Sequence, residues 1–285
     1  MLKCLPEGRL RIIADNQRIE RYKNEGIYCN GDRCDFYYVT PESDCDPADL
    51  LIFAVFSDLF EAISAAKKHV GPNTIIISLL NGISSESIIS SIYGEEKLIY
   101  CVAQGMDAVK VGNHLTYHTP GVLCIGEKEP GIISQRIYDI AGFFDKTGIS
   151  YEIKTDMQKH MWGKFMLNVG VNQTAAIYGC SYGGLQQEGA FRDIMILAMQ
   201  EVLMLSSKEG TGLNQKDLDY WLTVIEPLHP DGKPSMQQDI EAKRRSEVDL
   251  FAGTVLSIAE KHGIFTPVNR MLYDKILNIE KGFSY

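Results

Sequence analysis

The hydrophobic pattern of this chain changes its period near residue 155, and this change constrains the fold more than any other feature. Before it, short β-branched runs alternate with helical patterns, at residues 10–14, 51–55, 74–79, 98–102 and 122–125. That alternation predicts a doubly wound α/β sheet with helices on its faces. After a last short run at residues 149–153, nearly every residue from Met157 onward follows helical periodicity. We therefore expect an α/β domain at residues 1–154 and an all-helical domain at residues 155–285.

A small insertion is predicted at the edge of the sheet. Residues 27–30 and 35–39 flank the turn-like pair Gly31-Asp32, which suggests a hairpin. Residues 58–70 and 85–92 have the pattern of crossover helices between strands.

Composition narrows the classes of partner. The 285 residues carry a formal net charge of −9, which disfavours binding to nucleic acid. The longest apolar runs, residues 50–56 and 74–80, are far shorter than the roughly 20 residues of a membrane helix, so we expect no membrane partner. The N-terminal residues lack the continuous apolar segment of a secretory signal, which favours a cytoplasmic protein with reduced thiols. A small molecule is the expected partner.

The cysteine and histidine residues do not predict a metal. The seven cysteines are odd in number and include no Cys-x-x-Cys pair, so neither a disulfide framework nor a zinc site is indicated. His114 and His118 would share one face of a strand, but two ligands do not complete a metal site.

Three polar residues recur at four-residue intervals in a helix-compatible stretch: Lys164, Asn168 and Asn172. Four residues advance a helix by slightly more than one turn and about 6 Å, so one ammonium and two amides form a row on one face. A lysine in apolar company can give a proton to a carbonyl oxygen, and amides can donate to hydroxyl or carboxylate groups. The row thus suggests a site for a small oxygen-rich molecule. The alternative is that Lys164 reaches water while the asparagines satisfy backbone groups.

The glycine turn that binds a dinucleotide, Gly-x-Gly-x-x-Gly, does not occur near the N-terminus. In doubly wound folds an acidic residue closes the second strand, about 20 residues beyond that turn, and binds the adenosine ribose. Asp15 closes the run at residues 10–14 and has this position. We therefore expect the first strand and its glycine turn to precede Met1 in the full protein.

Four blocks of sequence resemble ketopantoate reductases (2-dehydropantoate 2-reductases). They are SLLNGISSE at residues 78–86, the Lys164/Asn168/Asn172 row with QTAA, PSMQQDIEAKRRSEVD at residues 234–249, and FAGTVLSIAEKHGIFTPVNRMLYDKI at residues 251–276. By their order and spacing the chain is identified as a member of this family, with the similarity running from about Leu10 to the C-terminus. The resemblance implies a Rossmann-like domain followed by an all-α domain. It also implies reduction of 2-dehydropantoate by NADPH, which gives pantoate for pantothenate and coenzyme A synthesis.

The resemblance also assigns roles to residues. Lys164 would be the general acid that protonates the carbonyl oxygen as hydride reaches the carbon, a role that suits an ammonium beside a developing negative charge. Glu247 would complete the polar cluster by binding substrate or orienting Lys164. Asn168, Asn172 and Ser235 match positions that hold the hydroxyl and carboxylate of the substrate.

Asn81 matches the family residue beside the nicotinamide. Plainer alternatives exist for it and for two other residues. Asn81 belongs to an Asn-Gly pair, which is common in turns. Ser235 follows Pro234 and could cap a helix, and Glu247 could be a solvated carboxylate near the basic residues 243–245.

Two residues depart from the family pattern at the expected cofactor site. Asp15 stands where the family usually has an arginine that pairs with the 2′-phosphate of NADP. A carboxylate there repels that phosphate and favours NAD, although Arg18 and Arg21 lie close in sequence. Phe56 stands in place of a family lysine that approaches the cofactor. The expected cofactor is NADP, with NAD as the alternative because of Asp15.

Three functions remain open at this point. The favoured one is a reductase whose first strand lies upstream of Met1. The second is a complete chain that has lost catalysis and serves as a ligand-binding or interaction protein. The third keeps the chemistry but acts on another 2-keto acid. A homodimer is also open, since the apolar pattern at residues 194–205 could pack within its domain or against a second subunit.

Overall fold

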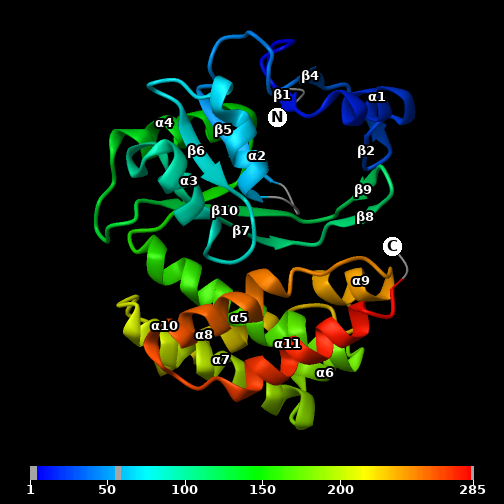
Figure 1. Ribbon diagram of the computed structural model, residues 1–285, viewed down its shortest axis with the longest axis vertical. Helices are drawn as coiled ribbons and strands as arrows, with labels where there is room; N and C mark the ends of the chain where they lie inside the picture. Colours follow the sequence, from blue (N-terminus) through cyan, green and yellow to red (C-terminus); the bar gives the residue numbers. More distant parts are fainter. Residues whose placement is uncertain (1–4, 55–58, 284–285) are drawn as a thin grey trace. The chain divides into compact units, whose positions relative to one another are not determined.

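The computed structural model describes residues 5–54 and 59–283, and these divide into two compact units (Figure 1). Met1–Leu80 and Ser85–Met157 form the first, called here the α/β unit. Asn81–Ser84 and Gln158–Tyr285 form the second, the helical unit. The predicted class, α/β followed by all-α, is confirmed by these elements. Phe56 lies outside the described residues.

The strands of the α/β unit are short. They are β1 Arg11–Ile13, β2 Tyr28–Cys29, β3 Asp32–Arg33, β4 Tyr37–Val39, β5 Leu50–Phe53, β6 Ile75–Ser78, β7 Tyr100–Met106, β8 Val109–Val111, β9 His114–Thr116, β10 Pro120–Gly126 and β11 Tyr151–Ile153. β1 pairs in parallel with β4, and β5 pairs in parallel with β6. β10 lies between β7, which is antiparallel to it, and β11, which is parallel.

The two parallel pairs fit the doubly wound order 3-2-1-4-5-6. The pairs form two separate two-stranded sheets; in that order β4 and β1 would correspond to places 3 and 2, and β5 and β6 to places 4 and 5. Among the described residues no strand takes the central place between the pairs. The carboxyl ends of β1 and β6, which carry Asp15 and the loop at residues 79–84, are the ends at which such sheets bind ligands.

The predicted hairpin at residues 27–39 is only partly right. β2 pairs antiparallel with β3, whereas residues 37–39 form β4 and pair with β1. The reason is a tight turn at Asn30 and Gly31, which both have positive φ, 49° and 87°. Such a turn closes a hairpin after two residues and leaves the next segment free to join another strand. β2 also pairs in parallel with β9.

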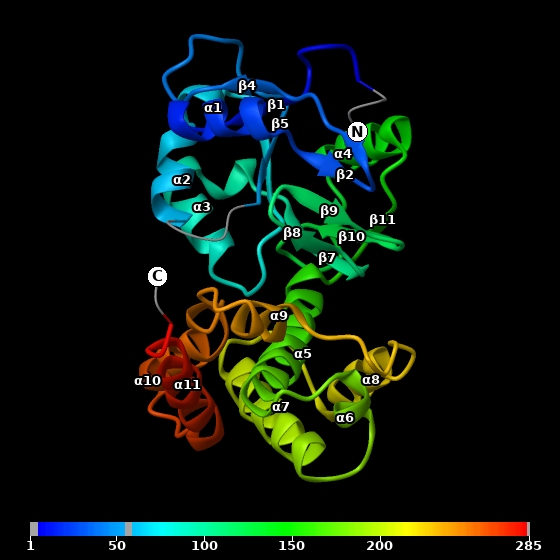
Figure 2. The ribbon, with the colours of Figure 1, turned by 90° about the vertical axis from the view of Figure 1, so that its right-hand side faces the viewer.

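In its described residues the α/β unit has four α-helices, α1 Asn16–Glu25, α2 Leu59–Ala65, α3 Ser85–Tyr93 and α4 Gln135–Thr147, with short 3₁₀ turns at Ala66–His69 and Glu95–Lys97. The last three of these α-helices cover both sides of β5 and β6. Figure 2 shows α2 and α3 on one side of these strands and α4 on the other. Ile137 and Phe144 of α4 pack with Ile77, Ile99 and Ile125 in one fully buried cluster, which explains the apolar runs of the sequence.

The helical unit is built around one long helix, α5, which spans Met157–Tyr178 (Figures 1 and 2). The other helices are α6 Tyr182–Gln186, α7 Ala190–Lys208, α8 Gln215–Ile225, α9 Ser235–Glu241, the π-helix Asp249–Gly253, α10 Thr254–His262 and α11 Pro267–Glu280. Residues 169–176 of α5 are all buried, which is typical of a helix enclosed by others. No helix in the described part of the chain is long and apolar enough to cross a membrane.

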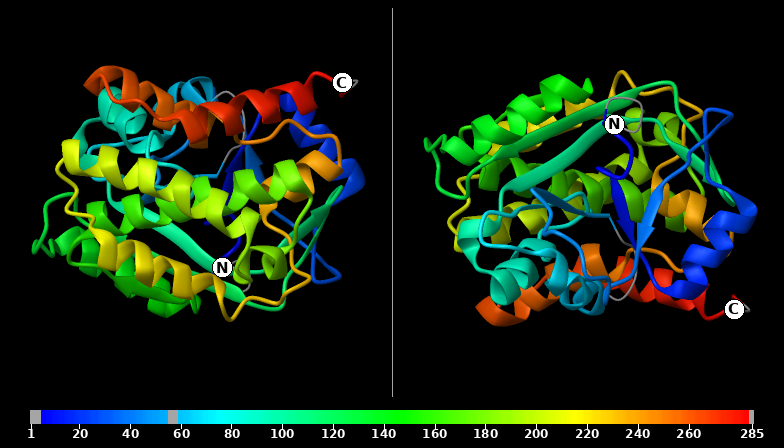
Figure 3. Two further views of the ribbon diagram at one scale, coloured as in Figure 1. Left: turned by 90° about the horizontal axis from the view of Figure 1, so that it is seen from below. Right: turned by 90° about the horizontal axis from the view of Figure 1, so that it is seen from above.

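Two glycines let neighbouring helices approach α5 closely, and Figure 3 shows α7 beside it. A Cβ on Gly163 would lie 2.0 Å from Nε1 of Trp221 in α8. A Cβ on Gly170 would lie 2.8 Å from the carbonyl oxygen of Met195 and 2.6 Å from Cγ of Met199, both in α7. The missing side chains therefore allow the close approach of α8 to α5 at Gly163 and of α7 to α5 at Gly170.

We expect Gly170→Ala to destabilise the protein by about 1–2 kcal/mol. Overpacking against a helix backbone costs about 1–3 kcal/mol, more than the roughly 1 kcal/mol that alanine gains over glycine in a helix. Gly142 of α4 is the matched control, because a Cβ there would meet nothing within 4 Å, so Gly142→Ala should hold or raise stability. Thermal unfolding measures both. A G170A protein as stable as wild type would contradict the close packing.

Candidate active site

Hydrogen bonds connect the polar row of α5, Lys164, Asn168 and Asn172, to the start of α9. Lys164 and Asn168 are half-buried and Asn172 is buried. The Asn172 side-chain nitrogen donates to Oδ1 of Asn168 at 3.4 Å. The Asn172 oxygen accepts from the hydroxyl of Ser235 at 3.2 Å and from the backbone N–H of Met236 at 3.3 Å. Because Asn168 turns its oxygen toward Asn172, its NH₂ group is directed away and can donate to a ligand.

Ser235 is not the cap of α9, so that alternative is wrong. Pro234 has the N-cap position with extended backbone, φ −61° and ψ 157°. Ser235 is the first residue of the helix, and its hydroxyl bonds to Asn172 instead of a backbone amide of α9. The proline thus directs Ser235 toward the polar row.

Asn81 and Glu247 lie far apart in sequence but are hydrogen-bonded within the helical unit. The Asn81 side-chain nitrogen donates to Oε2 of Glu247 at 2.9 Å. The next residue, Gly82, has φ 93°, and a Cβ on it would lie 3.2 Å from the carbonyl oxygen of Leu250. Glycine is needed here both for its positive φ and for close approach to the π-helix at Asp249–Gly253. The Asn-Gly pair therefore does more than make a turn.

Glu247 is a buried carboxylate, and only one of its two oxygens has a hydrogen-bond partner among the described residues. Its exposed fraction is 8%, so the solvated alternative is wrong. Oε1 is buried and has no hydrogen-bond partner among the described residues. Burial raises the pKa of Glu247 above its usual value; the hydrogen bond from Asn81 lowers it, the charge of Asp239 raises it and the charge of Lys164 lowers it. A buried acceptor of this kind requires a donor, which a ligand hydroxyl can supply.

The positive charge of Lys164 lowers the pKa of Glu247, as the smallest of the four influences on it. Lys164 offers a proton donor and Glu247 an acceptor, and Asn168 and Asn172 follow Lys164 along α5. This combination suits a small molecule with a carbonyl, a hydroxyl and a carboxylate.

Asp15 belongs to the α/β unit, unlike the other six predicted residues. It follows β1 and is the N-cap of α1, where its Oδ1 accepts from the backbone N–H of Arg18 at 2.7 Å. Its Oδ2 lies 3.8 Å from Nε of Arg18, and both side chains are more than half exposed. One carboxylate oxygen thus has a structural partner, while the other can accept from a ribose hydroxyl and Arg18 can meet a phosphate.

Sequence reasoning did not find two parts of the site. The backbone N–H of Met236 is one, and no sequence signal marks a backbone donor. The π-helix after Glu247 is the other. Its five residues read as ordinary helix, although Gly253 at its end could have suggested an irregularity.

Two family models and several named relatives match this chain. The family model "Ketopantoate reductase PanE/ApbA" matches residues 6–130, and "Ketopantoate reductase PanE/ApbA C terminal" matches residues 156–280. The chain is 26% identical over 230 residues to a 2-dehydropantoate 2-reductase of Aquifex aeolicus, covering 79% of this chain and 74% of that one. It is 24% identical over 274 residues to one of Streptococcus pyogenes serotype M18, covering 93% and 88%.

Solved structures with the same fold include reductases and a dehydrogenase. D-mandelate dehydrogenase with NADH and anilino(oxo)acetate superposes with a TM-score of 0.84 at 18% identity, covering 96% of this chain and 91% of that one. A PanE/ApbA family ketopantoate reductase from Ralstonia eutropha JMP134 gives 0.81 at 24% identity, covering 98% and 92%. A dimeric ketopantoate reductase from Staphylococcus aureus gives 0.72 at 19% identity, covering 90% and 86%.

The family models and the named reductases place the chain in a class of oxidoreductases with an α/β unit followed by a helical unit. The two family models together span most of the sequence, on both units. The chain belongs to the ketopantoate reductase family.

Proposed function

We propose that the protein reduces 2-dehydropantoate to pantoate with NADPH or NADH. One observation carries the proposal: the buried Glu247 carboxylate, bonded to Asn81, keeps one oxygen without a hydrogen-bond partner in the part of the chain that the structure describes. A keto acid with a hydroxyl group supplies the donor that this oxygen requires. The names of the relatives support the same substrate.

Each polar group then has a task. The Lys164 ammonium donates to the keto oxygen and passes its proton to that oxygen as negative charge develops. Oε1 of Glu247 accepts from the substrate hydroxyl, which removes the cost of an unpaired buried acceptor. The NH₂ group of Asn168 donates to the substrate carboxylate. Asn172 accepts a hydrogen bond from the Ser235 hydroxyl and so holds Ser235 beside the polar row.

A nicotinamide nucleotide fits part of the described chain. Asp15 and Arg18, at the end of β1 and the start of α1, can hold the adenosine ribose and its substituent. For Asn81 the contact with the nicotinamide is proposed from the family resemblance alone. When bound, the reduced nicotinamide supplies the hydride for the keto carbon. NADH in the structurally similar D-mandelate dehydrogenase supports a nucleotide of this class.

The experiment that tests the proposal has two parts. Calorimetry with NADPH and NADH measures nucleotide binding, and loss of nicotinamide absorbance measures turnover with 2-dehydropantoate. Saturable binding and turnover would support the proposal. If folded protein binds neither the nucleotide nor the keto acid, the proposal is overturned. That result would favour a protein without catalysis that binds a different ligand or a protein partner.

We expect Asp15→Asn to shift nucleotide preference toward NADPH by about five- to tenfold. Asparagine also caps helices, so α1 stays capped, while one negative charge near the 2′-phosphate is removed. The ratio of dissociation constants for NADPH and NADH is the measurement. Glu20→Gln is the matched control, because it removes a negative charge from the exposed face of α1. An unchanged ratio in D15N would show that Asp15 only caps the helix.

A different 2-keto acid is the second candidate substrate. The similarity to D-mandelate dehydrogenase, with a TM-score of 0.84, favours it. A panel of 2-keto acids with aliphatic and aromatic tails, compared by kcat/KM, decides between them. A higher kcat/KM for 2-dehydropantoate than for the other acids would support the first candidate, and a higher value for another acid would support the second.

We also propose a cytoplasmic homodimer. The dimeric relative from Staphylococcus aureus supports the dimer, and α7 exposes Leu197 and Met204, each 47% accessible, on its surface. Light scattering on the purified protein measures the mass. A monomer at all concentrations would remove this part of the proposal.

A further inference from the structure

Glu247 lies between helices, in a segment at residues 242–248 that is not part of any regular helix. α9 ends at Glu241, and Lys243 has φ 54°, a left-handed conformation that is uncommon for a residue with a side chain. The π-helix Asp249–Gly253 begins two residues after Glu247. The bonds to α9 reach only as far as Arg244, whose backbone N–H donates to the carbonyl of Asp239 at 2.8 Å, so Ser246 and Glu247 depend on other contacts.

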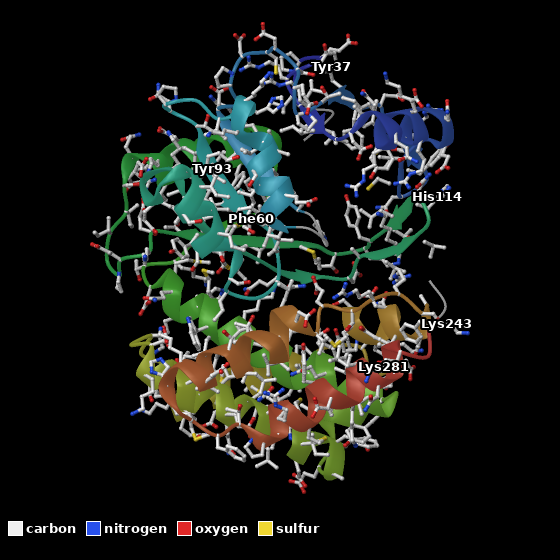
Figure 4. All side chains as sticks on the ribbon, in the orientation of Figure 1. Tyr37, Phe60, Tyr93, His114, Lys243 and Lys281 are labelled. Atoms are coloured by element: carbon white, nitrogen blue, oxygen red, sulfur yellow. The ribbon has the colours of Figure 1, made fainter. Side chains whose placement is uncertain are left out.

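One of these contacts comes from the end of α11. Oε1 of Glu280, the last residue of that helix, accepts from the backbone N–H of Ser246 at 2.7 Å. Glu280 is only 8% exposed, so this hydrogen bond between a carboxylate and an amide is largely shielded from water. In Figure 4, Lys243 and Lys281 mark the two partner segments, and they lie at the same end of the helical unit.

The other contacts lie on the C-terminal side of Glu247. Its carbonyl oxygen accepts from the backbone N–H of Leu250 at 2.9 Å and of Phe251 at 3.2 Å. The N–H of Gly253 reaches the carbonyl of Val248 at 3.0 Å, five residues back. The π-helix therefore fixes one side of Glu247 and Glu280 fixes the other. π-Helices occur often at functional sites, where they re-aim a side chain.

We propose that Glu280 is a positioning residue that holds the backbone of Ser246 and so aims the Glu247 carboxylate at its ligand. The inference rests on the proposed function for the identity of that ligand. Glu280 itself bonds the backbone amide and leaves the chemistry to Glu247. Its loss releases the backbone at Ser246, while the bond of Arg244 to α9 and the π-helix remain, so the carboxylate moves while the fold persists.

The first test measures the backbone directly. Amide hydrogen exchange over residues 243–250 should become at least about tenfold faster in Glu280→Ala than in wild type, because a buried hydrogen bond is lost. Glu280→Gln should restore most of the protection, since its amide oxygen can still accept. Asp274→Asn, an exposed change on the same helix, should leave exchange unchanged. Unchanged exchange in E280A overturns the proposal.

The second test measures coupling to Glu247. In the wild-type background E280A should lower kcat/KM for the keto acid by about tenfold or more, mainly through KM, and leave nucleotide affinity within about twofold. In an E247Q background the same change should have little further effect, because the group that it positions is already altered. Equal losses in both backgrounds would mean general destabilisation and would overturn the proposal.

The two tests separate the failure of this inference from the failure of the proposed function. A wild-type protein without activity on any 2-keto acid overturns the function, and the exchange experiment still decides whether Glu280 holds the segment. An active wild type with unchanged exchange and activity in E280A overturns only the inference.

Discussion

Lys164→Met should lower kcat/KM for the keto acid by about 10²–10⁴-fold. General acid catalysis contributes this much, and methionine has a similar length without a proton to give. The loss should fall mainly on kcat, since the ammonium acts on charge that develops on the carbonyl oxygen during the reaction. Nucleotide affinity should stay within about twofold of wild type by calorimetry, because the nucleotide-binding residues proposed above do not include Lys164.

Lys159→Met is the matched control for this experiment. Lys159 lies on the same helix, and its ammonium pairs with Asp217 at 3.0 Å. Its replacement removes one positive charge and a partly exposed ion pair, which is worth about 1 kcal/mol or less. Activity should therefore stay near wild type. A K164M protein with undiminished kcat would exclude Lys164 as the proton donor.

Glu247→Gln should lower kcat/KM for the keto acid by about 10–100-fold. A hydrogen bond to a charged group is worth about 1.5–3 kcal/mol, and glutamine offers a weaker acceptor and an NH₂ group that opposes a donor. The loss should appear mainly in KM. Glu260→Gln, an exposed change on α10, is the control and should have no effect. An E247Q protein with unchanged KM would remove Glu247 from the site.

The pH dependence of kcat/KM is a second test of whether the Glu247 carboxylate binds the substrate. Burial raises the pKa of its carboxyl above the usual 4.5. Only the carboxylate accepts through both oxygens, so substrate binding should weaken as pH falls through this raised pKa. The acidic limb of the profile should therefore lie above the pH at which an exposed glutamate titrates, and it should vanish in E247Q. A limb that persists in E247Q belongs to another group.

Periodicity predicted the class of fold because both units follow simple patterns. Short apolar runs mark β5 and β6, and long stretches without proline mark α5 and α7. The hairpin prediction failed in part at Asn30, because the pattern could not show that the turn closes after two residues. Strand pairing across long stretches of sequence, such as β2 with β9, is set by tertiary contacts that no local pattern records.

The sequence could predict which side chains share one face of α5, but it could not predict the hydrogen bonds that hold the site residues in place. The four-residue spacing of Lys164, Asn168 and Asn172 on one helix follows from helix geometry alone. Their partners do not, since the bond from Met236 is made by the backbone and the bond between Glu280 and Ser246 spans 34 residues. For the same reason the buried state of Glu247 could not be read from its basic neighbours.

Residues 81–84 belong to the helical unit although the chain on both sides of them belongs to the α/β unit. The two units are therefore not two consecutive segments that could be exchanged at a single junction. A chimaera that takes its C-terminal half from a relative would keep Asn81 from one parent and Glu247 from the other. Recombination within this family must preserve that pair across a gap of 166 residues, so the loop and the helical unit are expected to be inherited together.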